Sequence, residues 1–447
     1  MLDLSLGFKN KYISLYEQIR AKILSGKIKA GERLPSKRAL AEELGVSVTT
    51  VRLAYEQLLA EGYICSRERS GYFAEKINSH EIPSRKQSTP QKNARKEEYL
   101  CDLVNGNTPV HMFPFSTWAR LMRLVLSDCG EHLLERVPCG GDPELQQALS
   151  DYLYRSRGLD IDPRRIIIGA GSEQLYGVII KLLGRDKIFA VENPSYGKIS
   201  SAYALNGAKW VAVDVGERGV NVARLLNSGA HAVHISPAHQ FPTGVVTPVS
   251  VRLKIAEWAN SVGGYVIEDD YDSEFRLSGK PLQNMFGLCP SRVIYMNTFS
   301  KSLAPSMRLG YMVLPPDLYE RYINLFSSSA NVVPLFEQKA LAAMLNGGYF
   351  ERHLSRLKNY YKGIRKTLLE KLALLGEECE VTDSGSGLHI IVKFPNAKSD
   401  AQIKERAAER GVNLKCLSDY LIAPRQGLEC CAVINYSGLT KEILERL

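Results

Sequence analysis

The sequence contains no long apolar run and no regular pattern of cysteines. No apolar stretch approaches the roughly 18 residues that a membrane span needs, and the first residues, MLDLSLGFKNKY, lack the apolar core of a signal peptide. The nine cysteines are scattered and form no CxxC pair. These absences argue against a transmembrane protein, a disulfide framework and a cysteine zinc site, and they predict a cytoplasmic protein with reduced thiols.

The length and the charge distribution predict more than one domain. A chain of 447 residues is too long for one compact core. Residues 1–96 hold 18 Lys and Arg against 10 Asp and Glu, a net charge of +8, whereas the whole chain carries +9. A basic module therefore precedes a near-neutral body. Such asymmetry is typical of a chain whose end binds nucleic acid, although part of the excess lies in a Lys- and Arg-rich stretch that would also aid solubility.

Helical spacing of apolar residues predicts three short helices in the basic module. The first covers 12–22 and ends near Gly26, the second is capped by Ser36 and runs to residue 44, and the third is capped by Ser47 and ends at Gly62. The second and third helices, joined at Gly45, form a helix-turn-helix. Residues 63–74 predict a two-stranded hairpin wing.

Polar side chains in this module are placed for DNA contact, above all at the start of the third helix, where side chains and free N–H groups can meet phosphates and base edges. Each of them alone also fits an ordinary solvated surface. The candidates are Lys37, Arg38, Ser47, Thr49, Thr50, Arg52, Arg67 and Arg69.

The run GERLPSKRALAEELGVSVTTVRLAYEQLLAEGY, followed by RERSGYF, resembles the GntR-type winged helix-turn-helix over about residues 11–73. The resemblance implies DNA contacts at Arg38, Thr49, Arg52 and Gly71. Arg67 and Arg69 match less well, because the wing of that family is usually richer in glycine and Ser70 replaces one glycine here. Residues 76–98 carry many charges and almost no large apolar side chains, so we expect a flexible linker.

Two apolar runs in the body, 265–267 and 293–296, predict buried parallel strands. Asp269 follows the first strand, and Lys301 follows the second after a short turn. Ligands of open α/β sheets bind outside the carboxyl ends of the strands. An acid and an amine at that edge are therefore candidates for cofactor chemistry.

Pyridoxal phosphate (PLP) needs an amine for a Schiff base, a carboxylate for its pyridine nitrogen, an aromatic face and a phosphate site. Lys301 can supply the amine, Asp269 the carboxylate, and Tyr271 a hydrogen bond to the ring oxygen. Taken alone, a lysine after a strand is usually a solvated surface residue, but the set as a whole predicts PLP. The phosphate candidates are Thr298, Ser300 and Arg308, together with Gly171 and Ser172, which start a helix after a strand at 166–168.

The motifs EDDYDSEF and TFSKSLAPSMRLGY resemble those of fold-type I aminotransferases and, most closely, the aminotransferase-like half of MocR-type regulators. The resemblance implies that Tyr196 stacks on the pyridine ring. The run HQFPTG is also similar to MocR-type sequences, and its Phe241 stands where aminotransferases have an asparagine that bonds the ring oxygen. That bond is then left to Tyr271.

Three positions depart from the resembled families. Gly438 replaces the arginine that usually holds a substrate carboxylate, which argues against an ordinary α-amino acid bound in that way. Lys198 could substitute for that cation, although a solvated lysine at a helix start is the simpler interpretation. Arg136 stands where a tyrosine often reaches the phosphate of the neighbouring subunit.

We therefore interpret the chain as an α/β protein with a winged helix-turn-helix at residues 1–75, a linker at 76–98 and a fold-type I, PLP-binding, aminotransferase-like domain at 99–447. The resemblance implies a MocR-type transcriptional regulator that senses an amine, an amino acid or PLP itself. It also implies a head-to-tail homodimer that binds double-stranded DNA and uses the aminotransferase-like domain as a sensor. The alternatives are a true aminotransferase tethered to DNA and a DNA-binding protein with a cofactor-free scaffold.

Overall fold

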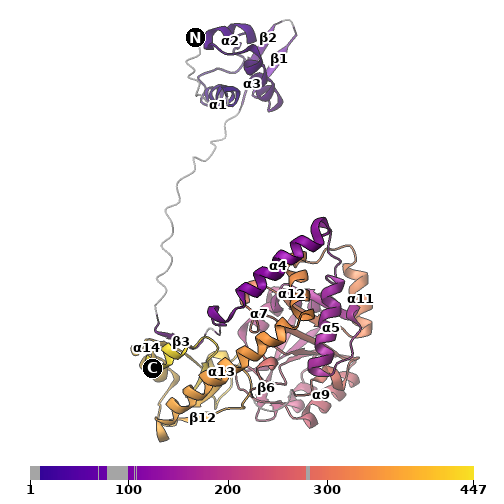
Figure 1. Ribbon diagram of the computed structural model, residues 1–447, viewed down its shortest axis with the longest axis vertical. Coiled ribbons are helices and arrows are strands. Elements are labelled where there is room, and N and C mark those ends of the chain that lie inside the picture. Colours follow the sequence, from indigo (N-terminus) through magenta and orange to yellow (C-terminus); the bar gives the residue numbers. More distant parts are fainter. Residues whose placement is uncertain are drawn as a thin grey trace. The chain divides into compact units, whose positions relative to one another are not determined.

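The computed structural model describes residues 11–68, 70–77, 99–104, 106, 108–277 and 282–446. Arg69 and residues 78–98 of the expected linker lie outside this set. The chain divides into two compact units, residues 1–96 and 97–447 (Figure 1). None of the helices in the described ranges is both long and apolar enough to cross a membrane.

The amino-terminal unit contains the three expected helices and the hairpin wing. Leu15, Ile19, Leu40, Val51 and Leu58 form its core and are fully buried. The two wing strands are antiparallel. The elements are α1 (Lys11–Leu24), α2 (Lys37–Leu44), α3 (Val48–Ala60), β1 (Ile64–Arg67) and β2 (Gly71–Ala74).

The expected caps of the helix-turn-helix are present. The side chain of Ser36 accepts a hydrogen bond from the backbone N–H of Ala39 at 3.2 Å, and that of Ser47 accepts one from Thr50 at 3.1 Å. Gly45 closes α2 in the left-handed conformation with φ of 64°. These local bonds satisfy backbone groups that a helix end leaves free.

Residues 31–34, which lie between α1 and α2, also extend the wing. The N–H of Gly31 donates to Ala74, and the N–H of Leu34 donates to Tyr72, both at 2.8 Å. Arg33 forms an isolated bridge with Phe73. Pairing of this kind covers an edge of β2 that would otherwise expose unpaired backbone groups.

The body is built on an eight-stranded sheet in the order β4-β11-β10-β9-β8-β5-β6-β7. The strands from β10 through β6 are parallel, and β11 runs antiparallel to both of its neighbours. The strands are β4 (Ile166–Gly169), β5 (Ile188–Asn193), β6 (Lys209–Gly216), β7 (Gly219–Val220), β8 (Ala232–Ile235), β9 (Tyr265–Asp269), β10 (Val293–Thr298) and β11 (Gly310–Val313).

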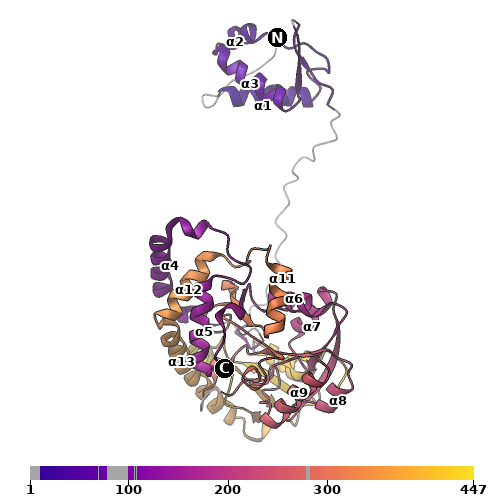
Figure 2. The same cartoon turned by 90° about the vertical axis from the view of Figure 1, so that its right-hand side faces the viewer.

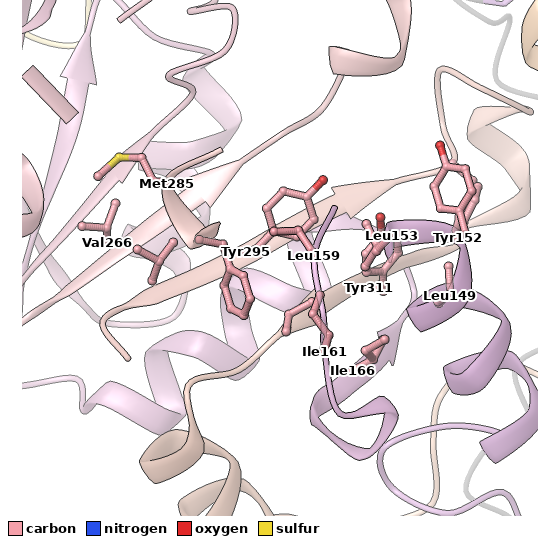
Figure 3. Packing of buried hydrophobic residues seen from close by; sticks show 14 of the residues in the cluster. Leu149, Tyr152, Leu153, Leu159, Ile161, Ile166, Val266, Met285, Tyr295 and Tyr311 are labelled. Carbon is pink, nitrogen blue, oxygen red and sulfur yellow. The ribbon is translucent and has the colours of Figure 1, made fainter. Parts of the chain in front are cut away.

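Helices pack on both faces of this sheet. The body helices are arranged around the sheet (Figure 2). Ile166 and Ile168 of β4 pack into one apolar cluster with α5, α9 and α12, of which Figure 3 shows a part, whereas Ile167 packs into a second cluster with α6, α7 and α11. A sheet covered on both faces explains the continuous apolar runs in the sequence. The helices are α4 (Phe115–Cys129), α5 (Pro143–Arg157), α6 (Ser172–Leu183), α7 (Gly197–Leu205), α8 (Val222–Leu226), α9 (Val249–Ser261), α10 (Met285–Leu288), α11 (Pro316–Phe326) and α12 (Leu335–Asn346).

A smaller sheet, in the order β12-β13-β16-β15, is antiparallel and packs against a long helix, α13. The short strands β3 and β14 pair in parallel. The elements are β3 (Cys101–Asp102), α13 (Tyr349–Ala373), β12 (Glu380–Thr382), β13 (His389–Lys393), α14 (Asp400–Glu409), β14 (Val412–Asn413), β15 (Lys415–Cys416), β16 (Cys431–Asn435) and α15 (Lys441–Arg446).

The helical region before α13 is interrupted between α11 and α12. Helix α11 ends at Phe326, and α12 begins only at Leu335. Pro334 occupies the N-cap position of α12. Because proline has no N–H group and restricts the residue before it, the new helix starts at this proline rather than continuing the previous one.

Candidate functional site

Asp269 and Lys301 come from neighbouring strands. Strand β9 ends at Asp269, and β10 runs parallel beside it with Met296 opposite Asp269. Lys301 follows the end of β10 after Phe299 and Ser300. The carboxylate and the amine therefore emerge at the same edge of the sheet, as the sequence analysis expects.

Asp269 has one engaged oxygen and one free oxygen. Tyr176 donates its hydroxyl hydrogen to Oδ2 at 2.6 Å, and Nε2 of His234 lies 3.5 Å from the same oxygen. Oδ1 is buried, and no residue in the described ranges donates to it. A buried carboxylate oxygen without a donor is costly, so a protonated pyridine nitrogen would fit this position.

Tyr176 and His234 are absent from the sequence-based candidates. Burial and the neighbouring Asp269 raise the pKa of Tyr176 well above its ordinary value, so its phenol remains a donor. Tyr176 lies in α6 and His234 in β8. Only the folded chain brings them to Asp269, and no local motif marks them.

The amine of Lys301 is held by the start of the body. Its Nζ donates to the carbonyl oxygen of Gly106 at 2.5 Å. A Cβ at Gly106 would lie 2.6 Å from Nζ, so this position has no room for a side chain. Burial lowers the pKa of Lys301, and the carboxylate of Asp272 opposes that shift. A lowered pKa increases the fraction of neutral amine, which is the nucleophilic form.

Gly171, Arg308 and Thr298 lie together at the start of α6. Gly171 precedes that helix with φ of 84°, and a Cβ there would lie 2.9 Å from a guanidinium nitrogen of Arg308. The guanidinium also donates to the carbonyl of Ala170 at 2.9 Å. A Cβ on Gly310 would lie 3.1 Å from Thr298 and 3.5 Å from Gly171. A helix start beside a fixed cation suits a phosphate.

The other two expected phosphate-binding residues are Ser172 and Ser300. Ser172 is the first residue of α6, directly after Gly171. Ser300 is half-buried in the turn between β10 and Lys301. Both remain sequence-based candidates, because the structure adds only their positions.

Three aromatic rings from different loops meet near these residues. Phe241 lies edge-on to Tyr196, with ring centroids 6.0 Å apart, and edge-on to Tyr271 at 6.4 Å. The side chain of Tyr196 is 44% exposed, which leaves part of its ring open to a ligand. Burial and Asp272 raise the pKa of Tyr271 well above its ordinary value, so its hydroxyl remains a donor.

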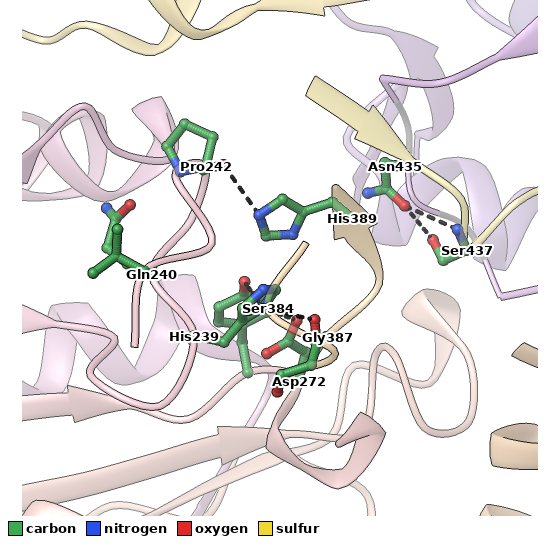
Figure 4. A network of polar contacts seen from close by, with 12 residues as sticks. His239, Gln240, Pro242, Asp272, Ser384, Gly387, His389, Asn435 and Ser437 are labelled. Carbon is green, nitrogen blue, oxygen red and sulfur yellow. Dashed lines mark hydrogen bonds and ion pairs between the residues drawn. The ribbon is translucent and has the colours of Figure 1, made fainter. Parts of the chain in front are cut away.

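His239, Asp272 and His389 form a buried polar cluster (Figure 4). The His239 ring stacks on that of Tyr271, with ring centroids 6.4 Å apart. Nδ1 of His239 donates to Asp272 at 2.8 Å, and Nε2 of His389 donates to the carbonyl of Pro242 at 3.1 Å. The two imidazole rings lie 4.4 Å apart. We call these three residues the histidine cluster. None of them is a sequence-based candidate, although two lie inside the motifs HQFPTG and EDDYDSEF.

Lys198 and Arg136, which the sequence analysis compares with a cation and a tyrosine of the resembled families, contact other residues of this chain. Lys198 is exposed, pairs with Glu173 at 3.4 Å and lies 5.8 Å from the centre of the Tyr196 ring. Arg136 donates to the carbonyl of Ser328. Gly438 follows β16 and is half-buried. Lys198 therefore has the surface ion pair of the simpler interpretation.

The DNA-binding candidates lie mostly on the surface of the amino-terminal unit. Arg38, Ser47, Thr49, Arg52 and Arg67 are exposed. Arg52 pairs with Glu56 at 2.8 Å within α3. The guanidinium of Arg67 lies 4.7 Å from the centre of the Phe73 ring, and Nζ of Lys37 lies 5.3 Å from that of Tyr72. These cation–π contacts hold the side chains of Arg67 and Lys37 against aromatic rings of the wing.

The wing also contains a cation that the sequence analysis did not select. Gly71 has φ of 111°, and a Cβ there would lie 3.4 Å from the guanidinium of Arg33. Arg33 is exposed and bridges to β2. The position of Arg33 on the wing follows from the pairing of residues 31–34 with β2, which the sequence alone does not show. Thr50 is half-buried, with its hydroxyl 2.9 Å from that of Ser47, and Arg69 lies outside the described residues.

Comparisons with known proteins agree with both units. The chain matches the gntR family of bacterial regulatory proteins over residues 11–73 and the aminotransferase class I and II family over residues 118–447. It is 34% identical to the uncharacterized HTH-type transcriptional regulator YdeL of Bacillus subtilis, across 90% of this chain and 88% of that protein. It is 32% identical to the probable rhizopine catabolism regulatory protein MocR of Rhizobium meliloti, across 95% and 90%.

A solved structure gives the same result for the body. The kynurenine aminotransferase of Pyrococcus horikoshii, solved with PMP, superposes with a TM-score of 0.68 and 26% identity, across 78% of this chain and 88% of that one. The match at the amino terminus is to a DNA-binding family, and the relatives that span nearly the whole chain are regulators. The chain therefore belongs to the MocR-type transcriptional regulators of the gntR family, which join a winged helix-turn-helix to a fold-type I aminotransferase domain.

Proposed function

We propose that this regulator holds PLP at Lys301 and uses the occupancy of that site to control DNA binding. The observation that carries the proposal is the pairing of two groups at the ends of neighbouring strands. One is the Lys301 amine, whose pKa is lowered, and the other is Oδ1 of Asp269, a buried carboxylate oxygen to which no described residue donates. Together they fit the two ends of a pyridine ring that carries an aldehyde.

Each part of the site has a role in holding the cofactor. Asp269 would receive the pyridine N–H, while Tyr176 and His234 fix the orientation of that carboxylate. Tyr271 would donate to the ring oxygen, and Tyr196 would cover one ring face. The phosphate would be held by Arg308, Gly171, Ser172, Thr298 and Ser300. Bound PLP supplies an aldehyde that reacts reversibly with amines and withdraws electrons from them.

The amine effector would act by competing with Lys301. An amine that displaces Lys301 returns the Nζ group to a free state, in which it can donate to Gly106 as the structure shows. Gly106 lies in the segment that begins the body, shortly after the expected linker. A ligand shifts an equilibrium only through unequal affinity for two states, so the effector must favour one arrangement of this segment.

The DNA side of the proposal depends on the start of α3. Thr49 and Arg52 face solvent there, where phosphates and base edges would be contacted. We further propose a homodimer, in the head-to-tail form that the resemblance implies. Large apolar side chains exposed on and after α4 support a self-contact, namely Phe115, Leu124, Leu126 and Leu134.

A second candidate function is transamination. The match of residues 118–447 to an aminotransferase family favours it. Multiple turnovers between amino donors and keto acids, at rates typical of dedicated enzymes, would support an enzyme. Half-reactions that stop after one equivalent of donor would support a sensor.

Absorption spectroscopy tests the proposal. Purified protein mixed with PLP is expected to gain a visible band that the Lys301→Ala variant lacks. DNA affinity should then be measured by fluorescence anisotropy with a fragment selected from a random library. A change in affinity on adding PLP supports the regulator, whereas colourless protein that is indifferent to PLP contradicts it.

A further inference from the structure

One exposed apolar side chain, that of Val48, lies among the polar residues at the start of α3. We propose that Val48 reads the 5-methyl group of a thymine in the major groove of the operator. Val48 is not one of the sequence-based DNA candidates, so a base preference is assigned here to a further residue of the helix. The assignment rests on the proposed function, because it requires α3 to lie in the groove.

Val48 is the first residue of α3 and follows the cap Ser47. It is 47% exposed, compared with 39% for Leu53 and 41% for Leu59 farther along the helix. In a helix-turn-helix, the N-terminal residues of the recognition helix contact base edges. Among the exposed apolar residues of α3, Val48 is therefore the one that is placed to meet a base.

Core packing does not explain a valine at position 48. The buried residues of α3 are Val51, Ala54, Tyr55 and Leu58. Val46, in the turn before α3, also packs against the core of this unit, whereas Val48 lies outside that apolar cluster of described residues. A single exposed valine is ordinary on a protein surface. What distinguishes Val48 is its position at the start of a recognition helix.

Two of the hydroxyl groups beside Val48 are engaged within the helix start. The Ser47 hydroxyl oxygen accepts the backbone N–H of Thr50 at 3.1 Å and lies 2.9 Å from the Thr50 hydroxyl. These contacts hold the first turn of α3 in place. Val48, Thr49 and Arg52 are exposed, and they therefore form the solvent-facing surface that a base would meet.

Val48 and Arg52 are four residues apart and lie on the same side of α3, one turn from each other. Arg52 pairs with Glu56 at 2.8 Å, which holds the arginine along this side of the helix. Four residues correspond to about 6 Å along a helix, and successive base pairs are about 3.4 Å apart. The base pairs that Val48 and Arg52 meet should therefore lie about one or two steps apart.

Thymine is the base that an apolar side chain can select in the major groove. It carries a C5-methyl group there, whereas the other bases present hydrogen-bond donors and acceptors. The valine side chain has no polar atom, so a base amino group or carbonyl pressed against it would lose water without gaining a partner. A valine in a helix also adopts mainly one χ1 rotamer, so the methyl groups of Val48 are already oriented before binding.

Deoxyuridine tests the assignment, because it pairs as thymidine does and lacks only the 5-methyl group. A duplex is first selected from a random library with the full-length wild-type protein. Each thymine is then replaced singly by deoxyuridine, and the affinity is measured by fluorescence anisotropy at one fixed salt concentration. At one thymine, we expect the replacement to weaken wild-type binding about fourfold, the effect of burying about one methyl group.

Val48→Ala should bind the thymine and deoxyuridine duplexes equally well at that position, because it removes the two methyl groups that make the contact. Two control variants should keep the difference of about fourfold. Thr49→Ser removes a methyl group from the adjacent exposed residue. Leu53→Ala truncates another exposed apolar side chain of α3.

Arg52→Ala locates the sensitive thymine relative to the arginine. Single base-pair substitutions show where this variant loses its preference, which marks the base pair that Arg52 contacts. The sensitive thymine should lie about one or two steps from that base pair. A distance of about five base pairs, which is half a turn of the duplex, would contradict the assignment to Val48.

Wild-type protein that binds every deoxyuridine duplex as tightly as the thymine duplex overturns this inference and leaves the proposed function intact. A methyl effect that persists in Val48→Ala also overturns it, because another residue then contacts that thymine. Failure of the wild-type protein to select any sequence from the library would instead contradict the DNA side of the proposed function. The two failures are therefore distinguishable.

Discussion

The two halves of the body site differ in how they are assembled. The cofactor half, formed by Asp269, Lys301, Gly171 and Arg308, lies at the edge of one sheet, on strand ends and the turns after them. The histidine cluster joins the HQFPTG loop, the middle of the EDDYDSEF motif and the start of β13. The first half is assembled by one sheet, whereas the second half is assembled by segments that only the folded chain brings together.

Among substitutions that distinguish the cofactor half from the histidine cluster, we expect the largest effect on the PLP band at Lys301. Lys301→Ala should abolish the visible band with PLP, because Lys301 is the amine that the proposal assigns to the PLP aldehyde. Lys209→Ala, at an exposed position on β6, should retain the band. An unchanged spectrum for Lys301→Ala would show that another group holds the cofactor.

Asp269→Asn should weaken PLP binding while the histidine cluster stays intact. Loss of a charge-assisted hydrogen bond costs about 1.5–3 kcal/mol, so the dissociation constant should rise about 10- to 100-fold. Equilibrium dialysis measures it, and Asp160→Asn is the matched surface control. Tyr176→Phe removes only the donor to Oδ2 and should have a smaller effect. Equal affinity in Asp269→Asn and wild type would contradict the pyridine assignment.

A third prediction compares the DNA-binding unit with the body. Arg52→Ala should weaken specific DNA binding by about 1–3 kcal/mol, if it reads a base edge as proposed, and leave the PLP band unchanged. Glu56→Ala breaks the same ion pair within α3 but keeps the arginine. This control should lose little or no affinity in a gel-shift titration. Equal losses would indicate that the helix, rather than the arginine contact, was damaged.

The coupling between the two halves should appear in the pH dependence of PLP capture. Burial lowers the pKa of Lys301, and Asp272 raises it in opposition. Asp272→Asn should therefore lower that pKa further, so that the neutral amine persists to lower pH. Capture rates measured in stopped flow should shift to lower pH in the variant. A shift toward higher pH would contradict the assigned sign.

The smallest effect concerns local stability. Ser47→Ala removes the side-chain acceptor at the start of α3, which should reduce the free energy of unfolding of the amino-terminal unit by about 1 kcal/mol. Thr49→Ala, at an exposed position in the first turn, is the matched control. Chemical denaturation followed by circular dichroism measures the difference. No loss relative to Thr49→Ala would show that the cap is dispensable.

The sequence was most informative where structure is local. Caps at Ser36 and Ser47, the αL glycine at 45 and the strands β4, β9 and β10 follow from short patterns, and the structure confirms them. Pairing of residues 31–34 with the wing depends on backbone partners that no short pattern records.

The site shows the same contrast. Asp269 and Lys301 were predictable because parallel strands deliver their ends to one edge. Tyr176, His234, Gly106 and His389 were missed, because they reach the site from distant segments. A buried carboxylate that lacks a local partner requires a distant donor, but the sequence does not say which one.

Chemical trapping tests the central claim most directly. Full-length protein is incubated with PLP, reduced with borohydride, digested and analysed by mass spectrometry for a phosphopyridoxyl group on lysine. The account predicts that the label lies on Lys301 and disappears in Lys301→Ala. A label on a different lysine, or no label at all, would contradict it.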